Sequence, residues 1–421
     1  MMQEFIKNDY KIVEFEDVAD VYVVNTCTVT NMADKKSRQM LRKVKEMNPN
    51  AILIAVGCYA QVARQELEKI PEIDLILGVN EKKDILKYIE EWKTGDNQAF
   101  VSDVIHQAEF VDFGSVTYTE KTRAVIKVQD GCDRYCSYCI IPYARGRVRS
   151  RKPENILKEI QSIADKKIKE VVITGIHIAS YGKDFKKEYR LIDLLEEINK
   201  IDGIERIRLG SIEPTLITEE FVNRLSKLNK ICDHFHLSLQ SGCDETLKRM
   251  NRKYTTEQFE NVTKILRKAY PNVALTTDII VGFPGETEEE FKKTYEYLEK
   301  ISFYKMHIFK YSQRKGTKAA IMPKQIDGIK KEERSKKLIA LSDANEIEYN
   351  QKYIGKTVKV LFEDEHIENG IIYMKGHTTN YIVVKIKLDD CHENYNNTIQ
   401  TVEITDTDGV ELIGKIINEL I

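Results

Sequence analysis

Three cysteines, Cys132, Cys136 and Cys139, lie in the run GCDRYCSYCIIPYARGR with the spacing Cys-x3-Cys-x2-Cys. Three thiolates at this spacing can bind three irons of a cubane iron–sulfur cluster and leave the fourth iron open. The amino and carboxylate groups of S-adenosylmethionine can chelate that iron, and an electron passed through the cluster then cleaves the sulfonium to a 5′-deoxyadenosyl radical. The spacing therefore predicts radical chemistry, in which the protein supplies ligands, orientation and exclusion of water.

A structural zinc site is the alternative for the same cysteines. Structural zinc takes four ligands, usually from two close cysteine pairs or from a cysteine pair and a histidine pair. The sequence has no second Cys-x2-Cys pair, and the nearest histidine, His106, lies in a stretch without periodic pattern. These observations favour the iron–sulfur cluster.

Length and composition indicate a globular protein of several domains. The chain has 421 residues, of which 31% are charged and 42% hydrophobic, so two to four domains are expected. No apolar run is long enough to span a bilayer, and the N-terminus lacks the apolar core of a signal peptide. Eight cysteines in such a chain indicate reduced thiols and a cytoplasmic location. The net charge is −2, so any nucleic-acid binding must come from local basic patches.

The first block, residues 1–93, alternates short apolar runs with helical patterns. The strand-like runs are Val21–Val24, Ala51–Val56 and Leu75–Leu77, and the helix-like segments are Lys35–Met47, Ala60–Lys69 and Lys82–Trp92. This rhythm predicts a Rossmann-like parallel βα domain. Residues 94–121 begin with a turn cluster and show little periodicity, so we interpret them as a linker.

The central block, residues 122–345, contains six strand candidates separated by helical patterns. They are Ala124–Gln129, Glu170–Thr174, Arg206–Ser211, Phe235–Gln240, Ala274–Val281 and Lys305–Tyr311. Thr255 with Gln258, and Thr287 with Glu290, have the spacing of capping boxes at helix starts. Repeated βα units predict a partial (βα)6 barrel with its chemistry at the carboxyl ends of the strands. Unusual motifs follow five of these strands: the cysteine loop, TGIHIASYG, SIEP, LQSG and GFPGET.

The last block, residues 346–421, alternates apolar and polar residues with a period of two. Val358, Val360 and Phe362 share one face of a strand, and Ile382, Val384 and Ile386 share another. Gly370, Gly376 and Gly409 interrupt the pattern. A small antiparallel β barrel fits this block.

Together these motifs resemble the radical S-adenosylmethionine methylthiotransferases. The resemblance is carried by NTCTVTNMADKKSRQ, GCYAQ, the cysteine loop with its following RVRSR, LGSIEP, LQSGCDETLKRMNRKY, DIIVGFPGETEEEF and GHTTNYIVV. It implies a methylthiotransferase domain, a radical core and a C-terminal TRAM domain. The run after Cys27 and the GIHI after the second core strand resemble the branch that methylthiolates threonylcarbamoyladenosine in tRNA, beside the anticodon. Branches acting on isopentenyladenosine in tRNA or on a ribosomal protein are the alternatives, as is an RNA-binding protein with a non-catalytic cluster.

The resemblance also implies a second, auxiliary iron–sulfur cluster and two uses of S-adenosylmethionine. Cys27 and Cys58 match two of its three cysteine ligands, but this sequence has no cysteine before Cys27. We expect that the recorded start omits a first strand and its ligand. The implied partners are tRNA and a reducing electron donor of flavodoxin or ferredoxin type, with no membrane. The sequence does not give the oligomeric state, for which a monomer is the default.

Residues near the predicted strand ends are candidates for cofactor binding. Tyr138 matches a superfamily position that packs on adenine, although it could instead cap the core. Glu213 and Gln240 could bind the ribose or amino group of S-adenosylmethionine. His177 could contact the cofactor or be structural, Gly175 begins the same motif, and Gly282 could let backbone approach the cofactor or form a plain turn.

Basic residues follow the cysteine loop closely. Arg145, Arg147 and Arg149, continued by Arg151 and Lys152, place five cations in eight residues. A solvated loop is the ordinary interpretation of such a run, but beside an active site it predicts RNA phosphate binding. The C-terminal barrel is a second candidate for RNA contacts.

Overall fold

The computed structural model describes residues 1–28, 30–92, 97–107, 109–114, 122–388 and 394–417. Contacts divide the chain into two units, the first comprising residues 1–118, 129–150 and 312–322, and the second residues 119–128, 151–311 and 323–421. The units do not follow the predicted domain boundaries, because the segment with the three-cysteine loop groups with the N-terminal residues. Among the helices of the described residues, none is long and apolar enough to cross a membrane.

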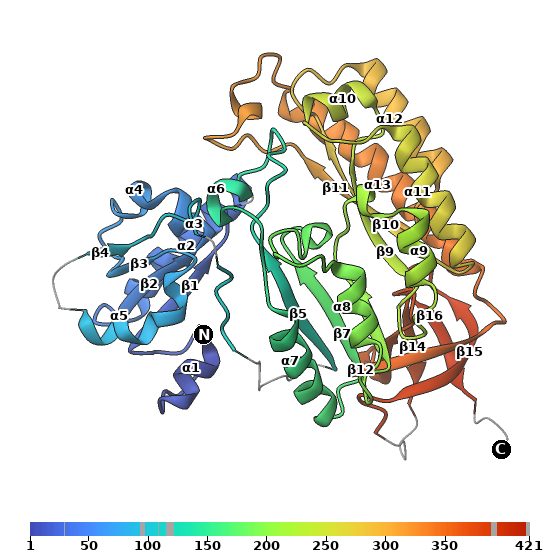
Figure 1. Ribbon diagram of the computed structural model, residues 1–421, viewed down its shortest axis with the longest axis horizontal. Helices are drawn as coiled ribbons and strands as arrows, with labels where there is room; N and C mark the ends of the chain where they lie inside the picture. The colour runs from blue at the N-terminus through green and yellow to red at the C-terminus, as the bar shows by residue number, and fades with distance from the viewer. Residues whose placement is uncertain (29, 93–96, 108, 115–121, 389–393, 418–421) are drawn as a thin grey trace. The chain divides into compact units, whose positions relative to one another are not determined.

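A sheet of four parallel strands, in the order β1-β2-β3-β4, forms the centre of the first unit (Figure 1). One face packs against Leu41 and Val44 of α2, and the other against Phe5 of α1 and Ile85 of α5. Both faces of the sheet are therefore covered, as parallel sheets require. The strands are β1 (Val21–Thr26), β2 (Ile52–Gly57), β3 (Leu75–Leu77) and β4 (Gln98–Phe100). The helices are α1 (Met2–Lys7), α2 (Asn31–Met47), α3 (Cys58–Val62), α4 (Arg64–Leu67) and α5 (Ile85–Glu91).

This sheet confirms the predicted Rossmann-like arrangement and corrects the predicted linker. Residues 98–100 form strand β4, which pairs parallel with β3 through Leu75–Gln98 and Leu77–Phe100. A three-residue edge strand is too short to leave a periodic pattern in the sequence, and its pairing comes from the neighbouring strand. Residues 94–96, 108 and 115–121 of the predicted linker lie outside the described part.

The second unit contains the predicted core strands in two neighbouring sheets. Strand β5 (Arg123–Asp130), which continues into the first unit at residue 129, lies beside β7, and β7 pairs parallel with β8. Strands β9, β10 and β11 form a parallel sheet, and isolated parallel bridges link Ile207 of β8 to Ile231 before β9, and Ile212 after β8 to Leu237 of β9. The strand bounds are β7 (Glu170–Gly175), β8 (Arg206–Leu209), β9 (His234–Gln240), β10 (Ala274–Val281) and β11 (Lys305–Lys310). All six predicted strands are present, and the partial barrel is confirmed.

Helices alternate with these strands, and their starts follow the sequence. Thr255 accepts from the backbone N–H of Gln258 at 3.2 Å while the Gln258 side chain accepts from the N–H of Thr255 at 3.0 Å. Thr287 and Glu290 make the same reciprocal pair, so both predicted capping boxes are confirmed. The helices are α7 (Pro153–Asp165), α8 (Leu191–Ile198), α9 (Glu219–Leu225), α10 (Asp244–Arg249), α11 (Thr256–Ala269), α12 (Glu288–Ile301) and α13 (Gly328–Gln351).

The C-terminal strands close into a five-stranded barrel in the order β12-β13-β14-β16-β15 (red in Figure 1). Its interior is apolar, and Val360, Phe362 and Val384 are fully buried. One pair departs from the predicted antiparallel pattern, because β14 and β16 run parallel. The strands are β12 (Thr357–Glu368), β13 (Ile371–His377), β14 (Val383–Lys387), β15 (Ile399–Thr407) and β16 (Leu412–Ile416). Helix α13 runs continuously across the boundary predicted between residues 345 and 346.

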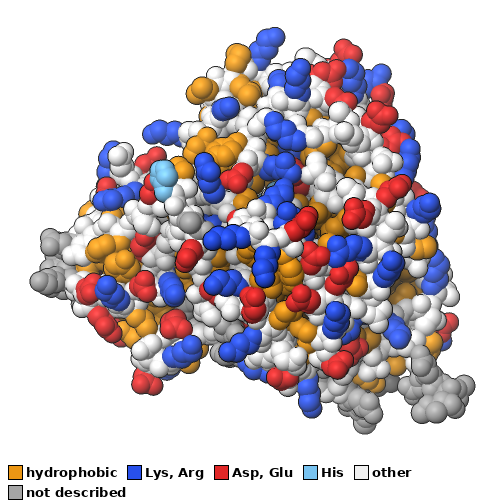
Figure 2. All heavy atoms as spheres, viewed as in Figure 1, with side chains coloured by type: hydrophobic (Ala, Val, Ile, Leu, Met, Phe, Trp, Pro, Cys, Tyr) orange, Lys and Arg blue, Asp and Glu red, His pale blue; other side chains and the backbone are white. Residues whose placement is uncertain are grey.

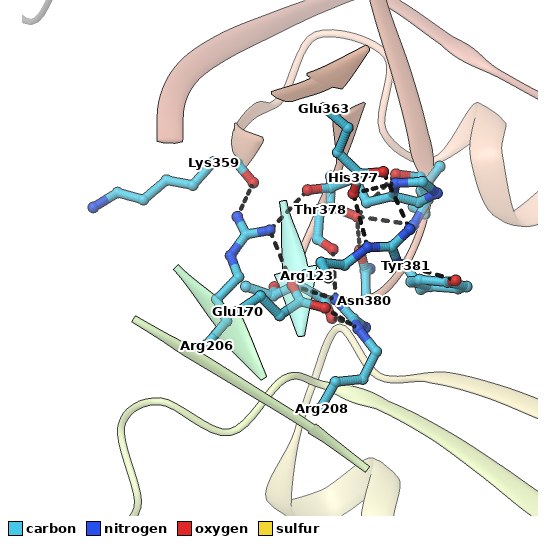
Figure 3. A network of polar contacts seen from close by, with 12 residues as sticks. Arg123, Glu170, Arg206, Arg208, Lys359, Glu363, His377, Thr378, Asn380 and Tyr381 are labelled. Carbon is cyan, nitrogen blue, oxygen red and sulfur yellow. Dashed lines mark hydrogen bonds and ion pairs between the residues drawn. The ribbon is translucent and has the colours of Figure 1, made fainter. Parts of the chain in front are cut away.

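Buried arginines join this barrel to the core strands within the second unit (Figure 3). Arg206 donates to the backbone carbonyls of His377 at 2.8 Å and Lys359 at 3.0 Å. Arg208 donates to Glu170 at 2.7 Å and to the carbonyl of Thr379 at 2.9 Å. The ring of Tyr381 stacks on His377 and lies 4.6 Å from the guanidinium carbon of Arg208. The contact is dense in fixed donors and acceptors, so we interpret it as a structural joint.

Candidate functional site

The three-cysteine loop leaves strand β5 at a sharply constrained turn in the first unit. Gly131 has a φ of +74°, and a Cβ there would lie 1.7 Å from the carbonyl oxygen of Arg147. The N–H of Cys132 donates to the carbonyl of Gly146 at 3.0 Å, and that of Cys139 to the carbonyl of Cys136 at 2.9 Å. Only glycine fits at position 131 without displacing the backbone. The loop is therefore held at its start by its own return segment.

All three thiols of this loop are half-buried, and so is Tyr138. No three His, Cys, Asp or Glu side chains converge on a point among the described residues, as they would around one metal ion. A four-iron cluster makes a different demand, because each thiolate binds its own iron and the sulfurs stand apart. Three half-buried thiols on one fixed loop fit that demand.

Cys27 and Cys58 follow adjacent strands of the first unit. Thr26, the last residue of β1, pairs with Gly57, the last residue of β2, so the two cysteines directly follow paired strand ends, Cys27 in a loop and Cys58 as the first residue of α3. The Thr26 hydroxyl donates to the carbonyl of Val56 at 2.7 Å and accepts from the N–H of Ala60 at 3.3 Å. Cys27 is exposed and Cys58 is buried. The two cysteines that the resemblance assigned to an auxiliary cluster therefore follow the paired ends of adjacent strands.

Arg145 lies against Cys58. It is the last residue of α6 (Ile141–Arg145), which follows the three-cysteine loop, and its Nε donates to the Cys58 sulfur at 3.1 Å. Asp130 lies 3.5 Å from the same guanidinium. Burial alone would lower the pKa of Arg145, but Cys58 and Asp130 raise it above its usual value, so the side chain stays charged. Sequence analysis did not predict this contact, because the two residues are 87 positions apart.

Arg149 is buried rather than exposed. Its side chain is 2% exposed, lies 3.7 Å from Asp130 and donates to the backbone carbonyl of Arg145 at 2.7 Å. A side chain with so little surface has no face to offer an RNA phosphate, which argues against the predicted role of Arg149. Arg147 is exposed, and the prediction of RNA binding stays with it. Basic and acidic side chains are interspersed on the face shown in Figure 2.

A second arginine holds the loop that contains Cys27. Arg314, from the segment 312–322, donates to Asp34 of α2 at 2.6 Å and also to the hydroxyl of Thr28. The same segment contacts the three-cysteine loop, because the N–H of Ala319 donates to the carbonyl of Ser137 at 2.8 Å. Both cysteine loops of the first unit are therefore braced by residues distant in the sequence.

In the second unit, two predicted cofactor residues contact each other. His177, two residues beyond the end of β7 at Gly175, has its Nε2 3.1 Å from Glu213, which follows β8. The other ring nitrogen lies 2.8 Å from the Ser180 hydroxyl, and the Thr215 hydroxyl donates to Glu213 at 3.0 Å. Polar groups thus gather at the carboxyl ends of two neighbouring strands, as predicted. Their hydrogen bonds also fit the structural alternative for His177.

Gln240 and Gly282 stand at the ends of β9 and β10. Gln240 is buried and has a φ of +72°, an uncommon conformation for a residue with a side chain. The N–H of Gly282 donates to Glu286 at 2.7 Å, and a Cβ on Gly282 would lie 2.3 Å from the Lys331 side chain. Burial raises the pKa of Glu286, which pairs with Arg334 at 2.6 Å. These contacts favour a turn held by α13 over close approach of a cofactor at Gly282.

Two family models match this chain. Residues 126–298 match the Radical SAM superfamily, and residues 1–78 match Uncharacterized protein family UPF0004. The solved structure of the radical S-adenosylmethionine methyltransferase TsrM from Kitasatospora setae shares the fold, with a TM-score of 0.54 and 16% identity over 70% of this chain and 63% of that chain.

Curated relatives match over nearly the whole chain. It is 42% identical to the Threonylcarbamoyladenosine tRNA methylthiotransferase MtaB of Bacillus subtilis over 91% of this chain and 86% of the relative. Identity to the protein of that name from Aquifex aeolicus is 43%, over 91% and 92%. Identity to the tRNA-2-methylthio-N(6)-dimethylallyladenosine synthase of Clostridium novyi is 36%, over 97% and 90%. The chain therefore belongs to the radical S-adenosylmethionine methylthiotransferase family.

Proposed function

We propose that this chain adds a methylthio group to C2 of N6-threonylcarbamoyladenosine, the modified adenosine beside the tRNA anticodon. The observation that carries the proposal is the ranking of its relatives. Identity is 42% and 43% to two threonylcarbamoyladenosine enzymes and 36% to the dimethylallyladenosine enzyme of Clostridium novyi. A ring C–H bond resists acid–base chemistry, so a radical route suits this substrate.

Cys132, Cys136 and Cys139 are the ligands that we propose for the four-iron cluster that binds S-adenosylmethionine. The bound cluster and cofactor supply the radical. The protein fixes the ligand loop through Gly131 and Gly146, and half-buries the thiols. Tyr138 is the proposed contact for the adenine.

Cys27 and Cys58 are the proposed ligands of an auxiliary cluster. Two features support this assignment: the cysteines directly follow the paired strand ends Thr26 and Gly57, and Arg145 donates an N–H to the sulfur of Cys58. Other cofactor contacts that we propose are Glu213, Gln240 and His177, at the ends of three core strands.

The proposed partners are tRNA, through Arg147 and the closed C-terminal barrel as a TRAM domain, and a flavodoxin- or ferredoxin-type electron donor. We propose a monomer acting in the cytoplasm. Binding of tRNA does not need a uniformly positive surface, because each phosphate is contacted by an individual basic side chain.

Mass spectrometry of tRNA nucleosides tests the proposed function. Cells lacking the protein should accumulate threonylcarbamoyladenosine without its 2-methylthio form, and expression of the chain should restore that form. Restoration should fail with a variant in which Cys132, Cys136 and Cys139 are alanine. Unchanged 2-methylthio-threonylcarbamoyladenosine in the deleted cells would contradict the substrate assignment.

A second candidate substrate is dimethylallyladenosine in tRNA. It is favoured by 36% identity over 98% of this chain to the corresponding synthase of Thermoanaerobacter sp. (strain X514). The same nucleoside profile separates the two, because only one of the two methylthio nucleosides should disappear.

A further inference from the structure

Two tyrosines of the first unit expose their rings beside the three-cysteine loop. Tyr135 lies between the first two cysteines of that loop and is 40% exposed, and Tyr143 lies on α6 and is 41% exposed. Their ring centroids are 6.0 Å apart, and the interplanar angle is 80°. In such an edge-to-face pair, the partner ring covers only one of the four ring faces. The pair therefore offers flat aromatic surface on which a third ring can stack.

The backbone fixes the positions of both rings. Tyr135 has a φ of +48°, a left-handed conformation that residues other than glycine rarely adopt. The N–H of Tyr143 donates to the carbonyl of Ile140 at 3.0 Å, and the next residue, Ala144, is fully buried. Side chains that are already positioned lose less conformational freedom when a ligand binds to them. The two rings are thus preorganised for a contact.

The segment 312–322 of the same unit lies along the three-cysteine loop. The N–H of Ala319 donates to the carbonyl of Ser137 at 2.8 Å, and a Cβ on Gly316 would lie 3.8 Å from Cδ1 of Ile140. Ser137 is two residues beyond Tyr135 in the chain. The segment and the tyrosine pair therefore belong to one local surface.

The exposed charges of this surface are mainly positive. In residues 129–150 and 312–322, the fully exposed charged residues are Arg147, Lys315 and Lys318 against Asp133. Within the described part of the chain, none of the three cations is in an ion pair with an acidic side chain. They are therefore available to an anionic partner.

We propose that Tyr135 and Tyr143 form a stacking platform for an unpaired base of the tRNA anticodon loop, next to the adenosine that is modified. The inference deepens the proposed function and rests on tRNA as the partner. Proteins that bind single-stranded RNA stack splayed-out bases on aromatic rings and contact the phosphates with basic side chains. This surface combines both kinds of side chain.

An acidic protein, such as the electron donor, would be the other partner for a basic surface with exposed tyrosines. The core of a protein–protein interface requires a larger apolar area than a single stacked base. In residues 129–150 and 312–322, all of them described, the exposed large apolar side chains are Tyr135, Tyr143 and Ile321 alone. The small apolar area favours a nucleobase.

The test measures binding of an unmodified anticodon stem–loop RNA to the full-length chain after anaerobic reconstitution, by fluorescence anisotropy at several salt concentrations. A second set of RNAs carries the fluorescent adenine analogue 2-aminopurine at one loop position at a time, because stacking on an aromatic ring quenches its emission. The variants are Tyr135→Ala, Tyr143→Ala, Tyr143→Phe and Tyr10→Ala. Tyr10 is the matched control, since it is 36% exposed and forms an edge-to-face pair with Phe5 of the same unit.

Tyr135→Ala and Tyr143→Ala should each weaken RNA binding by roughly 5-fold or more, the contribution of one stacked base, and should restore emission at one loop position. The log–log salt slope should stay that of the parent chain, because no phosphate contact is lost. Tyr143→Phe, which keeps the ring, and Tyr10→Ala should bind like the parent. The iron content of each variant shows whether the cysteine loop is intact. If Tyr135→Ala loses iron, Tyr143→Ala on α6 decides.

Three results would overturn the inference. Parent-like affinity and quenching in both alanine variants would show that no base stacks on the pair, and slower reduction of these variants by flavodoxin would assign the pair to the electron donor. An equal loss of affinity in Tyr10→Ala would make the effect nonspecific. A lower salt slope in the alanine variants would assign the loss to phosphate contacts.

The failure of the proposed function has a different result. A parent chain that binds no RNA would remove tRNA as the partner, whereas in the three cases above the parent still binds it. Because the RNA is unmodified, the outcome does not depend on which nucleoside the enzyme modifies.

Discussion

Buried or half-buried arginines occur in both units, but their acceptors differ. At the contact between the core and the C-terminal barrel, Arg206 and Arg208 donate to backbone carbonyls and to Glu170. In the first unit, Arg145 and Arg149 approach one shared carboxylate, Asp130, at 3.5 and 3.7 Å, and the closer contact of Arg145 is to a sulfur at 3.1 Å.

The difference in acceptors distinguishes a structural contact from a contact with a group that can change its charge. The carbonyls and the paired Glu170 are not groups that take up metal, so we expect the arginines of the barrel contact to contribute to stability. A cysteine sulfur changes its charge and its bonding when it takes up metal. Of the two arginines, Arg145 contacts the sulfur of Cys58, whereas Arg149 contacts backbone carbonyls and Asp130.

Removal of the three thiols of the cysteine loop should have the largest effect. With Cys132, Cys136 and Cys139 changed to alanine, reduced reconstituted protein should no longer form 5′-deoxyadenosine from S-adenosylmethionine, because the open iron is lost. Chromatography of the products measures this. Cys243→Ala, which removes a buried thiol of the second unit, should retain cleavage. Full cleavage by the triple variant would refute the ligand assignment.

Removal of an arginine from the contact between the core and the barrel should lower the free energy of unfolding. It should not change the chemistry of the cysteine loop. Arg208→Leu leaves Glu170 buried without its closest partner, so the free energy of unfolding of the apo chain should fall by about 3–5 kcal/mol. Urea denaturation measures it. Lys359→Ala keeps the carbonyl that Arg206 uses and should change stability by less than about 0.5 kcal/mol. A loss below about 1 kcal/mol for Arg208→Leu would mean that the joint is dispensable.

The smallest effect concerns Arg147, which belongs to neither buried group. Arg147→Ala should weaken tRNA binding a few-fold and reduce the log–log salt slope by roughly 0.7–0.9, the contribution of one phosphate contact. Fluorescence anisotropy at several salt concentrations measures both. Lys36→Ala removes an exposed charge elsewhere and should leave the slope unchanged. If both variants retain the parent slope, Arg147 is a solvated side chain and no phosphate contact.

The strands and helix starts of the core could be read from the sequence because their signals are local. Apolar runs of a strand's length and reciprocal caps such as Thr255 with Gln258 depend on neighbouring residues, and the structure reproduces them. The cysteine positions at strand ends follow from the same reasoning, since the strands before Cys27 and Cys58 were predicted.

Features that depend on distant partners could not be predicted. Strand β4 forms by pairing with the edge strand β3, and the parallel pair β14–β16 depends on how the barrel closes. Arg149 lies in a run whose sequence is typical of an exposed basic loop. In the fold its side chain is buried, donates to the carbonyl of Arg145 and lies near the carboxylate of Asp130. A one-dimensional charge pattern does not distinguish these cases.

The first unit is discontinuous, and this has a consequence for synthesis. Arg314 anchors Asp34, and the two residues are 280 positions apart. At translation rates of about 5–20 residues per second, Asp34 is made some 14–56 s before its anchor. The contacts of Arg314 and Ala319 with the segments around the cysteines can therefore form only after most of the central block has been made. The first unit is complete only when its last segment, residues 312–322, has been synthesised.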